Sequence, residues 1–496
     1  SRACVAVPAA LLALLLALLL KQNHSSGAQA PPVLFTWVPF VGAGLELGAD
    51  AAAFFRKRAA QLGEVFQAHL AGNDVYFVTN PNLYPAVLRR SREFDFQPIA
   101  DEFQEKAFGY AAKEGEVLDA VAFHRLYTQH LKSSEGVGGL TSRSMRSLEQ
   151  VLPAEVAALL DSGGGAGDLY AIVSRVIFKS TMPAIFDPAT ATEEALRDFQ
   201  AFDAKFAFLS GGVPLKYFPE AAAGWERNTA LLTGDYYEAA SKFMQDRHEV
   251  YLRGNIAEEN IAKLQAIFIW AANANTIPTG FWTLYFLLRD AAMLERVRSE
   301  VRRAAGDSGG GLTLESLGRL ELLDSCIDEA LRLASGSMMM RVVKKDTPLE
   351  LEGGTTVVLK AGKRLAFYPG QLHFDAGVFP QPFCFVGDRF LQQRRRGQPF
   401  ELRGRKLHQP VMAFGGGVSM CPGRNFAKTE IKHFIARLLL EYDVELEGVA
   451  AGAEGAVDTT AADFPEMDLS RAGLGVYPPK AAVPCVLKRR SMPHGG

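Results

Sequence analysis

One short segment restricts what this chain can fold into more than any other feature: a cysteine that lies in a glycine-rich turn directly before a helix. Residues 414–424 read FGGGVSMCPGR, and a helical pattern follows from Asn425 to Leu440. Amides at a helix N-terminus are unsatisfied donors with a partial positive charge, so they stabilise the thiolate of Cys421. Glycines let the backbone fold closely around the sulfur and let a flat cofactor lie against it. A thiolate that binds haem iron needs this arrangement, whereas a lone cysteine is usually a buried structural residue.

The composition is that of a large globular protein. The chain has 496 residues, of which 48% are hydrophobic and 22% charged, so it can bury a large core or enclose a bulky ligand. Lysine and arginine (53) balance aspartate and glutamate (55), which excludes a nucleic-acid binder that works by broad phosphate neutralisation. The five cysteines are scattered and form no CxxC pair, which argues against a disulfide framework or a structural zinc site.

The amino-terminal stretch from Ala3 to Leu20 contains no charged residue. As a helix it spans roughly 27 Å, about the thickness of the hydrocarbon core of a bilayer. We expect residues 1–30 to form a membrane anchor and hinge, and residues 31–496 to form one catalytic domain. The alternative is a cleaved secretory signal, because residues 28–30 resemble the small-x-small cleavage rule, but Pro31 makes that cleavage awkward.

Periodicity predicts a mainly helical chain with a small sheet. Residues 64–78 read as a β-hairpin around Gly72-Asn73-Asp74, and β-branched residues between 341 and 368 predict strands that rejoin it. Helical periodicity dominates from Asp119 to about Gly318, and glycine-rich stretches at 163–167 and 309–311 are expected to be surface loops.

Residues 414–424 resemble the haem-thiolate loop of the cytochrome P450 family. Two stretches that precede them in the chain resemble two further motifs of this family, in the order in which the family has them. Glu329 to Arg332 resembles the ExxR helix of that family, and Asp388-Arg389-Phe390 resembles its PxxFxxxRF element, with Pro382 and Phe385 in register. The ExxR pattern alone is not specific, because it also occurs at Glu194 with Arg197, Glu295 with Arg298, and Glu300 with Arg303. Order and spacing carry the resemblance, which covers essentially the whole chain.

The resemblance implies a P450 fold, mainly α with a small β-sheet region, and a haem b cofactor. The residues that it assigns to the cofactor are Cys421 as the axial ligand of the iron, Arg341 at a haem propionate, and Phe414, Gly415 and Gly423 in the loop. It also implies a buried ion network of Glu329, Arg332 and Arg389 behind the loop. The chain departs from the family at Ser419, where a basic residue is usual, and shows no WxxxR helix near residues 124–131.

The stretch from Ala266 to Leu288 reads as a long apolar helix with polar residues at Asn273, Asn275, Thr276 and Thr279. It matches the distal helix of the family, in which an acid followed by threonine conducts protons to the oxygen. Asn275 stands in the place of the acid and does not readily ionise, so we expect proton delivery through Thr276 and ordered water. Pro278 removes the amide that would bond the carbonyl of Ala274, which predicts a kink and a polar notch.

Residues 270–282 (WAANANTIPTGFW) and 468–475 (DLSRAGLG) resemble the sterol 7α-hydroxylase branch of the family, which groups with sterol 12α-hydroxylase and prostacyclin synthase. The implied function is monooxygenation of a sterol-like lipid, with Thr276 and Asn275 organising protonation and residues 335–340 lining the cavity. The alternative is a lipid endoperoxide isomerase of the prostacyclin synthase type, which needs no reductant and lacks this threonine. A non-catalytic haem carrier is disfavoured because it would not need a polar notch opposite the thiolate.

The resemblance also implies partners and a location. These are O2, electrons from NADPH-cytochrome P450 reductase, and the endoplasmic reticulum membrane, with a single N-terminal anchor and a cytosolic catalytic domain. The basic run from Asp388 to Lys406 is expected to border the proximal haem face, where an acidic reductase docks, although such runs are usually solvated faces. Residues 206–218 are apolar but contain Gly211, Gly212 and Pro214, so we expect a loop that dips into membrane lipid; core packing is the alternative.

Overall fold

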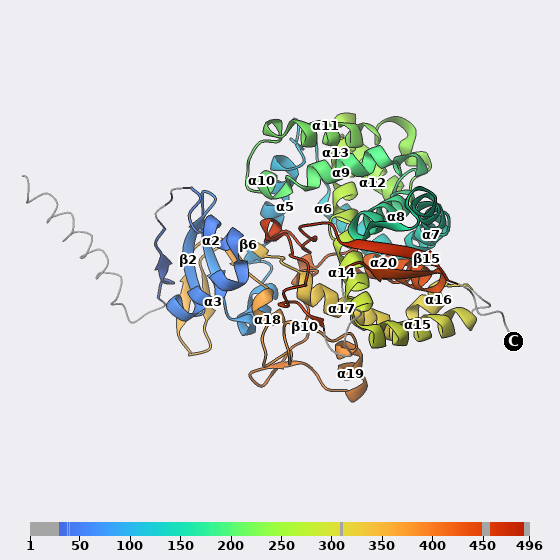
Figure 1. The fold of residues 1–496 in the computed structure, drawn as a ribbon. Helices are drawn as coiled ribbons and strands as arrows, with labels where there is room; N and C mark the ends of the chain where they lie inside the picture. The colour runs from blue at the N-terminus through green and yellow to red at the C-terminus, as the bar shows by residue number, and fades with distance from the viewer. Residues whose placement is uncertain (1–28, 37, 39, 308–310, 449–456, 491–496) are drawn as a thin grey trace, which may run out of the picture.

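A small β-rich lobe lies beside a larger helical body (Figure 1). The structure is a computed structural model that describes residues 29–36, 38, 40–307, 311–448 and 457–490. The expected anchor and most of its hinge, residues 1–28, and the glycines at 309–310 lie outside these residues. Within the described ranges no helix is long and apolar enough to cross a membrane.

The β-rich lobe is built on a six-stranded sheet whose order is β1-β2-β3-β9-β6-β4. Its strands are β1 (Val33–Leu34), β2 (Val65–Leu70), β3 (Asn73–Val78), β4 (Phe94–Asp95), β6 (Met339–Val343) and β9 (Arg364–Phe367). The predicted hairpin is confirmed, with Val65 opposite Val78. Its turn lies at Ala71 and Gly72, where φ is 47° and 76°, so Asn73 and Asp74, which were expected in the turn, begin strand β3 instead. The later strands rejoin it, because β9 lies parallel to β3 and antiparallel to β6.

The core of the helical body is arranged around α14 (Thr276–Arg289), whose residues from Thr276 to Leu287 are all buried. The long helices that pack against it are α8 (Leu169–Ile185), α13 (Glu258–Asn273), α15 (Ala291–Gly306), α17 (Glu321–Ala334) and α20 (Arg424–Glu441). Helix α7 (Ser134–Gly163) packs on α8 and α20. A helix that is apolar on all sides belongs in a core, so the interior place of α14 follows from its sequence. The prediction of a mainly helical chain is confirmed.

Shorter elements complete the fold. The helices are α2 (Gly44–Ala49), α3 (Ala51–Leu62), α4 (Tyr84–Leu88), α5 (Gln97–Lys106), α6 (Ala120–Tyr127), α9 (Glu193–Asp203), α10 (Phe206–Ser210), α11 (Pro219–Ala230), α12 (Lys242–Arg253), α16 (Leu314–Gly318), α18 (Gly370–His373) and α19 (Arg389–Arg396). The strands are β5 (Ala166–Asp168), β7 (Thr347–Glu350), β8 (Thr356–Leu359), β10 (Cys384–Phe385), β11 (Glu401–Leu402), β12 (Arg405–Lys406), β13 (Tyr442–Leu446), β14 (Val457–Asp458) and β15 (Pro484–Arg489).

The glycine-rich stretch at 163–167 differs from the surface loop that composition predicts. Strand β5 begins inside it and pairs with β15, which in turn pairs with β13. Gly165 is required there, because a Cβ on it would lie 2.1 Å from the carbonyl oxygen of Leu487. The glycines therefore permit a close approach of two backbones, which composition alone does not distinguish from a loop.

Residues 206–218 divide between the two alternatives that the sequence left open. Helix α10 buries Phe206 and Leu209, which are 1% and 0% exposed. Phe208, Val213 and Tyr217 face solvent at 54%, 37% and 65% exposure. One face of this segment therefore packs on the core and the other is an exposed apolar surface.

Candidate active site

The cysteine loop places Cys421 at the entrance to α20. The amide of Cys421 donates to the carbonyl of Phe414 at 2.9 Å, which closes residues 414–421 into a compact loop. Gly415 and Gly417 have φ values of 75° and 68°, in the left-handed region that favours glycine. A Cβ on Gly417 would also lie 2.8 Å from the carbonyl oxygen of Leu88. The glycines thus allow the loop to fold back against α4.

All cysteines in the described part of the chain are free thiols, and Cys421 is the exposed one among Cys326, Cys384, Cys421 and Cys485. Its side chain is open to solvent, but the surrounding loop lies within the protein body, and this burial raises the pKa of the Cys421 thiol. The backbone amides of Gly423 and Arg424 and the Arg424 guanidinium act in the opposite direction. The thiol therefore has helix-terminal donors ready for its anionic form.

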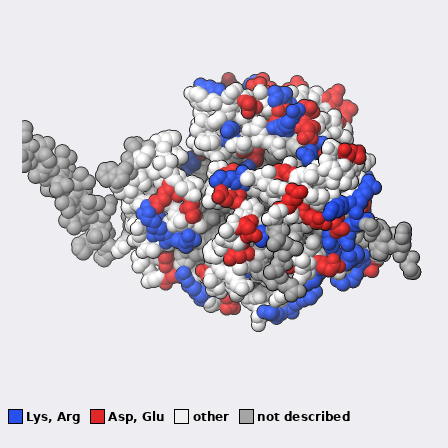
Figure 2. All heavy atoms as spheres, viewed as in Figure 1, with Lys and Arg blue, Asp and Glu red and all other residues white. Residues whose placement is uncertain are grey.

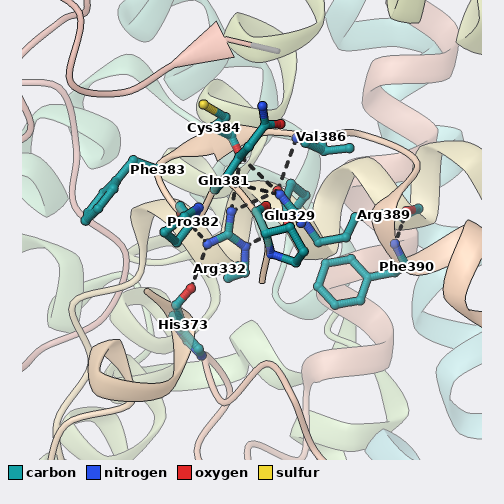
Figure 3. Close-up of polar contacts among 12 residues, drawn as sticks. Glu329, Arg332, His373, Gln381, Pro382, Phe383, Cys384, Val386, Arg389 and Phe390 are labelled. Atoms are coloured by element: carbon teal, nitrogen blue, oxygen red, sulfur yellow. Dashed lines mark hydrogen bonds and ion pairs between the residues drawn. The ribbon is translucent and has the colours of Figure 1, made fainter. Parts of the chain in front are cut away.

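An ion network centred on the carboxylate of Glu329 joins α17 to Arg389 at the start of α19 (Figure 3). Arg332 donates from Nε and Nη2 to the two carboxylate oxygens of Glu329, at 2.8 Å each. Arg389 donates from Nε to Glu329 Oε1 at 2.9 Å. The carbonyls of His373, Pro382 and Cys384 accept the other N–H groups of Arg332 at 2.7, 2.6 and 3.2 Å. Glu329 and Arg332 are 0% exposed, so these bonds replace the water that both charges lost.

His373 connects this network to the cysteine loop. Its carbonyl accepts from Arg332, and its Nε2 accepts from the amide of Met412 at 2.9 Å. Burial, followed by the charge of Arg332, lowers the pKa of His373 to about 3, so the ring is neutral and Nε2 is free to accept. One imidazole thereby joins the network to the residue that precedes the loop.

The surroundings of Cys421 fit a haem. Arg341 is 6% exposed and donates to the carbonyls of Met340 and Gly416 at 2.7 and 3.1 Å. It forms no ion pair with a carboxylate among the described residues, and burial lowers its pKa. A buried cation without a counter-ion among the described residues, beside the thiol loop, suits an anionic group such as a propionate. Phe414 and Gly423 flank the thiol: Phe414 accepts the amide of Cys421, and a Cβ on Gly423 would lie 4.0 Å from its sulfur.

The distal helix is broken rather than kinked. Helix α13 ends at Asn273 and α14 begins at Thr276, with Asn275 as its N-cap. Pro278 has no N–H for the carbonyl of Ala274, which accounts for the position of the break. The side-chain hydroxyl and the amide of Thr279 both donate to the carbonyl of Asn275, at 2.6 and 3.1 Å. The expected interruption is confirmed, and it is deeper than a bend.

The polar residues at the break lie in different surroundings. Thr276 is 5% exposed, and its hydroxyl has no hydrogen-bond partner within the described ranges. The Oδ1 of Asn275 accepts from the amide of Val476 at 2.9 Å, so this amide group is bound to the carboxy-terminal segment. Asn273 is fully buried and donates to the carbonyl of Ile269 at 2.8 Å. Of the predicted pair, Thr276 therefore has the free hydroxyl.

Residues 335–340, the segment predicted to line the substrate cavity, lie beside the cysteine loop. The hydroxyl of Ser337 lies 3.0 Å from that of Ser335 and 3.4 Å from the carbonyl of Ala413 in the cysteine loop. Met339 is 6% exposed and belongs to the core of the β-rich lobe, whereas Met338 and Met340 are half-buried. The alternation of strand β6 thus separates the three methionines, which a run of identical residues does not reveal.

Sequence reasoning missed two residues near the site, His373 and Glu430. Glu430 on α20 is 3% exposed, and its Oε1 accepts from the hydroxyls of Ser144 and Thr181 at 3.0 and 2.7 Å. The helical pattern contained a signal for Glu430, because the acid shares the spacing of the buried residues Phe426 and Phe434. For His373 no such signal exists, since its role depends on distant backbone groups.

Known proteins resemble the chain over nearly its whole length. A sequence model of the family described as Cytochrome P450 matches residues 224–451. "Cytochrome P450 7A1" of Oryctolagus cuniculus is 30% identical over 90% of this chain and 91% of the relative. "Cholesterol 7-alpha-monooxygenase" of Cricetulus griseus is 30% identical over 91% and 92%. "7-alpha-hydroxycholest-4-en-3-one 12-alpha-hydroxylase" of Homo sapiens is 26% identical over 90% and 91%.

The fold of the chain also resembles that of a solved structure. The solved structure titled "Retinoic acid bound cyanobacterial CYP120A1" superposes with a TM-score of 0.67, at 18% identity, and covers 94% of this chain and all of that one. The thiol loop, the buried ExxR network and the broken distal helix occur together in a chain that these relatives match from end to end. The chain belongs to the cytochrome P450 family and is an oxidoreductase of the monooxygenase type.

Proposed function

We propose that the protein hydroxylates a sterol-like lipid, RH + O2 + 2 e⁻ + 2 H⁺ → ROH + H2O. The observation that carries this proposal is the free hydroxyl of Thr276 at the helix break, in a chain whose relatives include enzymes named as cholesterol 7α-monooxygenase and sterol 12α-hydroxylase. A haem b held by Cys421 would supply the activation of O2. Every other role belongs to residues of the chain.

The geometry of the site supports the following roles. Cys421 would bind the iron, Arg341 would hold a propionate, and Phe414, Gly415 and Gly423 would form the surface on which the cofactor lies. A threonine hydroxyl can both donate and accept a hydrogen bond, so the free hydroxyl of Thr276 would pass protons inward from ordered water. Asn275 does not ionise, and it contributes by fixing the backbone beside Thr276.

A lipid endoperoxide isomerase is the second candidate, since its substrate already carries the O–O bond. The deciding experiment incubates the purified protein with a panel of sterols and lipid endoperoxides, with and without reductase and NADPH. We expect the haem absorption spectrum to shift with sterols, and we expect hydroxylated product only with the full electron supply. Rapid conversion of an endoperoxide without reductase, with no sterol product, would replace the monooxygenase by the isomerase.

The electron donor is proposed to be NADPH-cytochrome P450 reductase, docked near α19. Figure 2 shows lysine and arginine side chains gathered over this helix, which ends in Arg394, Arg395 and Arg396. An acidic partner is steered to such a surface by charge. Reversal of these three arginines to glutamate should slow reduction at low salt and change little at high salt, as measured by stopped-flow reduction.

We further propose attachment to the endoplasmic reticulum membrane through residues 1–30, with residues 31–496 as a cytosolic catalytic domain. The exposed side chains Phe208, Val213 and Tyr217 would provide a second contact with lipid and a route for the substrate. Deletion of residues 1–30 should leave a haem-loaded protein that still binds lipid vesicles weakly. A product without vesicle affinity would limit membrane contact to the amino terminus.

A further inference from the structure

The carboxy-terminal segment 467–479, called here the C-terminal loop, is held by backbone bonds to residues 334–338, between the end of α17 and the start of β6. Gly336 forms two backbone hydrogen bonds with this loop. Its N–H donates to the carbonyl of Gly475 at 2.8 Å, and its carbonyl accepts from the N–H of Gly473 at 2.8 Å. Tyr477 donates to the carbonyl of Ala334 at 2.9 Å. These bonds place the loop beside Ser337, whose hydroxyl reaches the cysteine loop.

The same loop is attached to the broken distal helix at two points. Val476 donates to Asn275 Oδ1 at 2.9 Å, and the indole of Trp282 donates to the carbonyl of Tyr477 at 2.6 Å. A Cβ on Gly475 would lie 1.9 Å from Asn275 Oδ1, so only glycine permits this approach. The C-terminal loop thus contacts the helix break directly, and through Gly336 it lies beside Ser337, whose hydroxyl reaches the carbonyl of Ala413 next to the cysteine loop.

A buried carboxylate closes the other end of the loop. Asp203, the last residue of α9, accepts from both Nη atoms of Arg471, with Oδ1 at 2.8 Å from Nη2. The same Oδ1 accepts from the indole N–H of Trp270 on α13 at 2.8 Å. The side chains of Asp203 and Arg471 are 11% exposed. One carboxylate therefore joins three elements: α9, the distal helix and the C-terminal loop.

The partners of Asp203 are the two stretches that resemble the sterol 7α-hydroxylase branch. Trp270 and Asn275 lie in the first, and Arg471 and Gly475 lie in the second. The two stretches contact each other directly, from Val476 to Asn275, and through Asp203, which bonds both Trp270 and Arg471. A buried ion pair of this kind stabilises less through its net energy than through the geometry that it imposes.

We propose that Asp203 is a positioning residue, which holds the C-terminal loop against the distal helix and thereby determines which substrate carbon is oxidised. The second part rests on the proposed function; the first part does not. Loss of the carboxylate leaves the buried guanidinium of Arg471 without a counter-ion, so the loop should open more often. The bound substrate would then occupy several orientations instead of one.

The test compares Asp203→Asn with Asp198→Asn on the same helix. Asp198 accepts from Arg227 at 2.8 Å in a bidentate pair on α11, which does not involve the C-terminal loop. Amide hydrogen exchange of holoprotein peptides covering residues 466–479 should be about tenfold or more faster in Asp203→Asn and unchanged in Asp198→Asn. Equal exchange in wild type and Asp203→Asn overturns the proposal, whatever the substrate.

Two further variants protect the test against a folding failure. If Asp203→Asn does not load haem, Arg471→Lys keeps the charge but loses the second hydrogen bond, and it should exchange at an intermediate rate. Trp270→Phe removes only the indole donor and should have a smaller effect. Unchanged exchange in both variants would also overturn the proposal.

Product analysis then separates the two proposals. With any substrate that the wild type hydroxylates, Asp203→Asn should broaden the ratio of positional isomers severalfold, and Asp198→Asn should preserve it. A single unchanged product despite faster exchange would overturn the role in regioselectivity. Absence of any hydroxylation by the wild type would refute the proposed function, and the exchange data would still decide the role of Asp203 in holding the loop.

Discussion

The thiol side and the distal side of the site differ in how completely their polar groups are hydrogen-bonded. On the thiol side, Arg332 and Arg389 both donate to the buried carboxylate of Glu329, and they also donate to backbone carbonyls of the segment that follows. On the distal side the helix is interrupted at Asn275, and the hydroxyl of Thr276 has no partner within the described ranges. On the thiol side several hydrogen bonds fix each charged side chain in place, whereas on the distal side one hydroxyl forms no hydrogen bond to the described residues.

This difference corresponds to two chemical tasks. A metal ligand must remain at one place through every step, and a network in which each member has several partners achieves this. A group that passes protons must change partners, so permanent bonds would hinder it. Rigidity and freedom are therefore divided between the two sides.

The strongest test of the thiol side is Cys421→Ser. A hydroxyl is a poor substitute for a thiolate on iron, so the absorption of the reduced CO complex at the thiolate-haem position should be lost completely. The measurement is the CO difference spectrum of purified protein. An unchanged spectrum would show that another residue is the ligand.

The second test removes one charge from the buried network. Glu329→Gln leaves the guanidinium of Arg332 without its counter-ion, and we expect a loss of about 3–5 kcal/mol in the free energy of unfolding. The measurement is denaturant unfolding of the haem-loaded protein, together with its haem content.

A matched control exists on the surface. Glu194 and Arg197 have the same ExxR spacing and a contact of 3.2 Å, but their side chains are 72% and 65% exposed. Glu194→Gln should change the free energy of unfolding by no more than about 0.5 kcal/mol. Similar losses in both variants would refute the distinction between a buried and a solvated pair.

Glu430 allows a test of burial by pH. Burial raises the pKa of Glu430 from 4.5 to about 7, and the hydroxyls of Thr181 and Ser144 only partly offset this. The folded state therefore binds the proton more tightly than the unfolded chain, so this group's contribution to stability falls between about pH 4.5 and 7. The full loss is about 3 kcal/mol.

The measurement compares melting temperatures of wild type and Glu430→Gln from pH 5 to 8. The two should differ least at pH 5, and the variant should be more stable at pH 8. Glu149→Gln is the control of opposite sign, because His433 at 3.7 Å and the charge of Arg437 at 2.7 Å lower the pKa of Glu149. That variant should be less stable than wild type by a similar amount across the whole range from pH 5 to 8. Parallel curves for wild type and Glu430→Gln would contradict the assignment.

The sequence predicted the thiol side well because its signals are local. Cys421 and its glycines lie in one stretch, and Glu329 and Arg332 lie on one helix. Arg389 is 60 residues from Glu329, but it belongs to a second local motif, PxxFxxxRF. The bond from Met412 to His373 could not be predicted, because it joins segments 39 residues apart through a backbone amide.

The distal side shows the same limit. Pro278 predicted an interruption of the helix, since the effect of proline is local. The position of the Asn275 amide was not predictable, because it depends on Val476, which is 201 residues away. A hydrogen bond between two segments that are far apart in the chain leaves no pattern in the sequence of either segment.

The finest test of the comparison is Thr276→Ala, which removes the free hydroxyl and leaves the thiol side intact. Substrate should still bind, because the substitution deletes one small group beside the chamber, and the sterol-induced spectral shift should keep its amplitude. Without the hydroxyl, proton delivery becomes slower while the supply of electrons is unchanged. Reducing equivalents are therefore released as hydrogen peroxide. We expect the hydroxylated product formed per NADPH to fall by about tenfold, equivalent to 1.4 kcal/mol in the competition between the two outcomes. The control is Thr283→Ala on the same helix, whose hydroxyl is already bound to the carbonyl of Thr279 at 2.7 Å and has no proton to pass. If both variants couple as well as the wild type, the free hydroxyl of Thr276 is not part of proton delivery, and the division between a fixed side and a free side fails at its distal end.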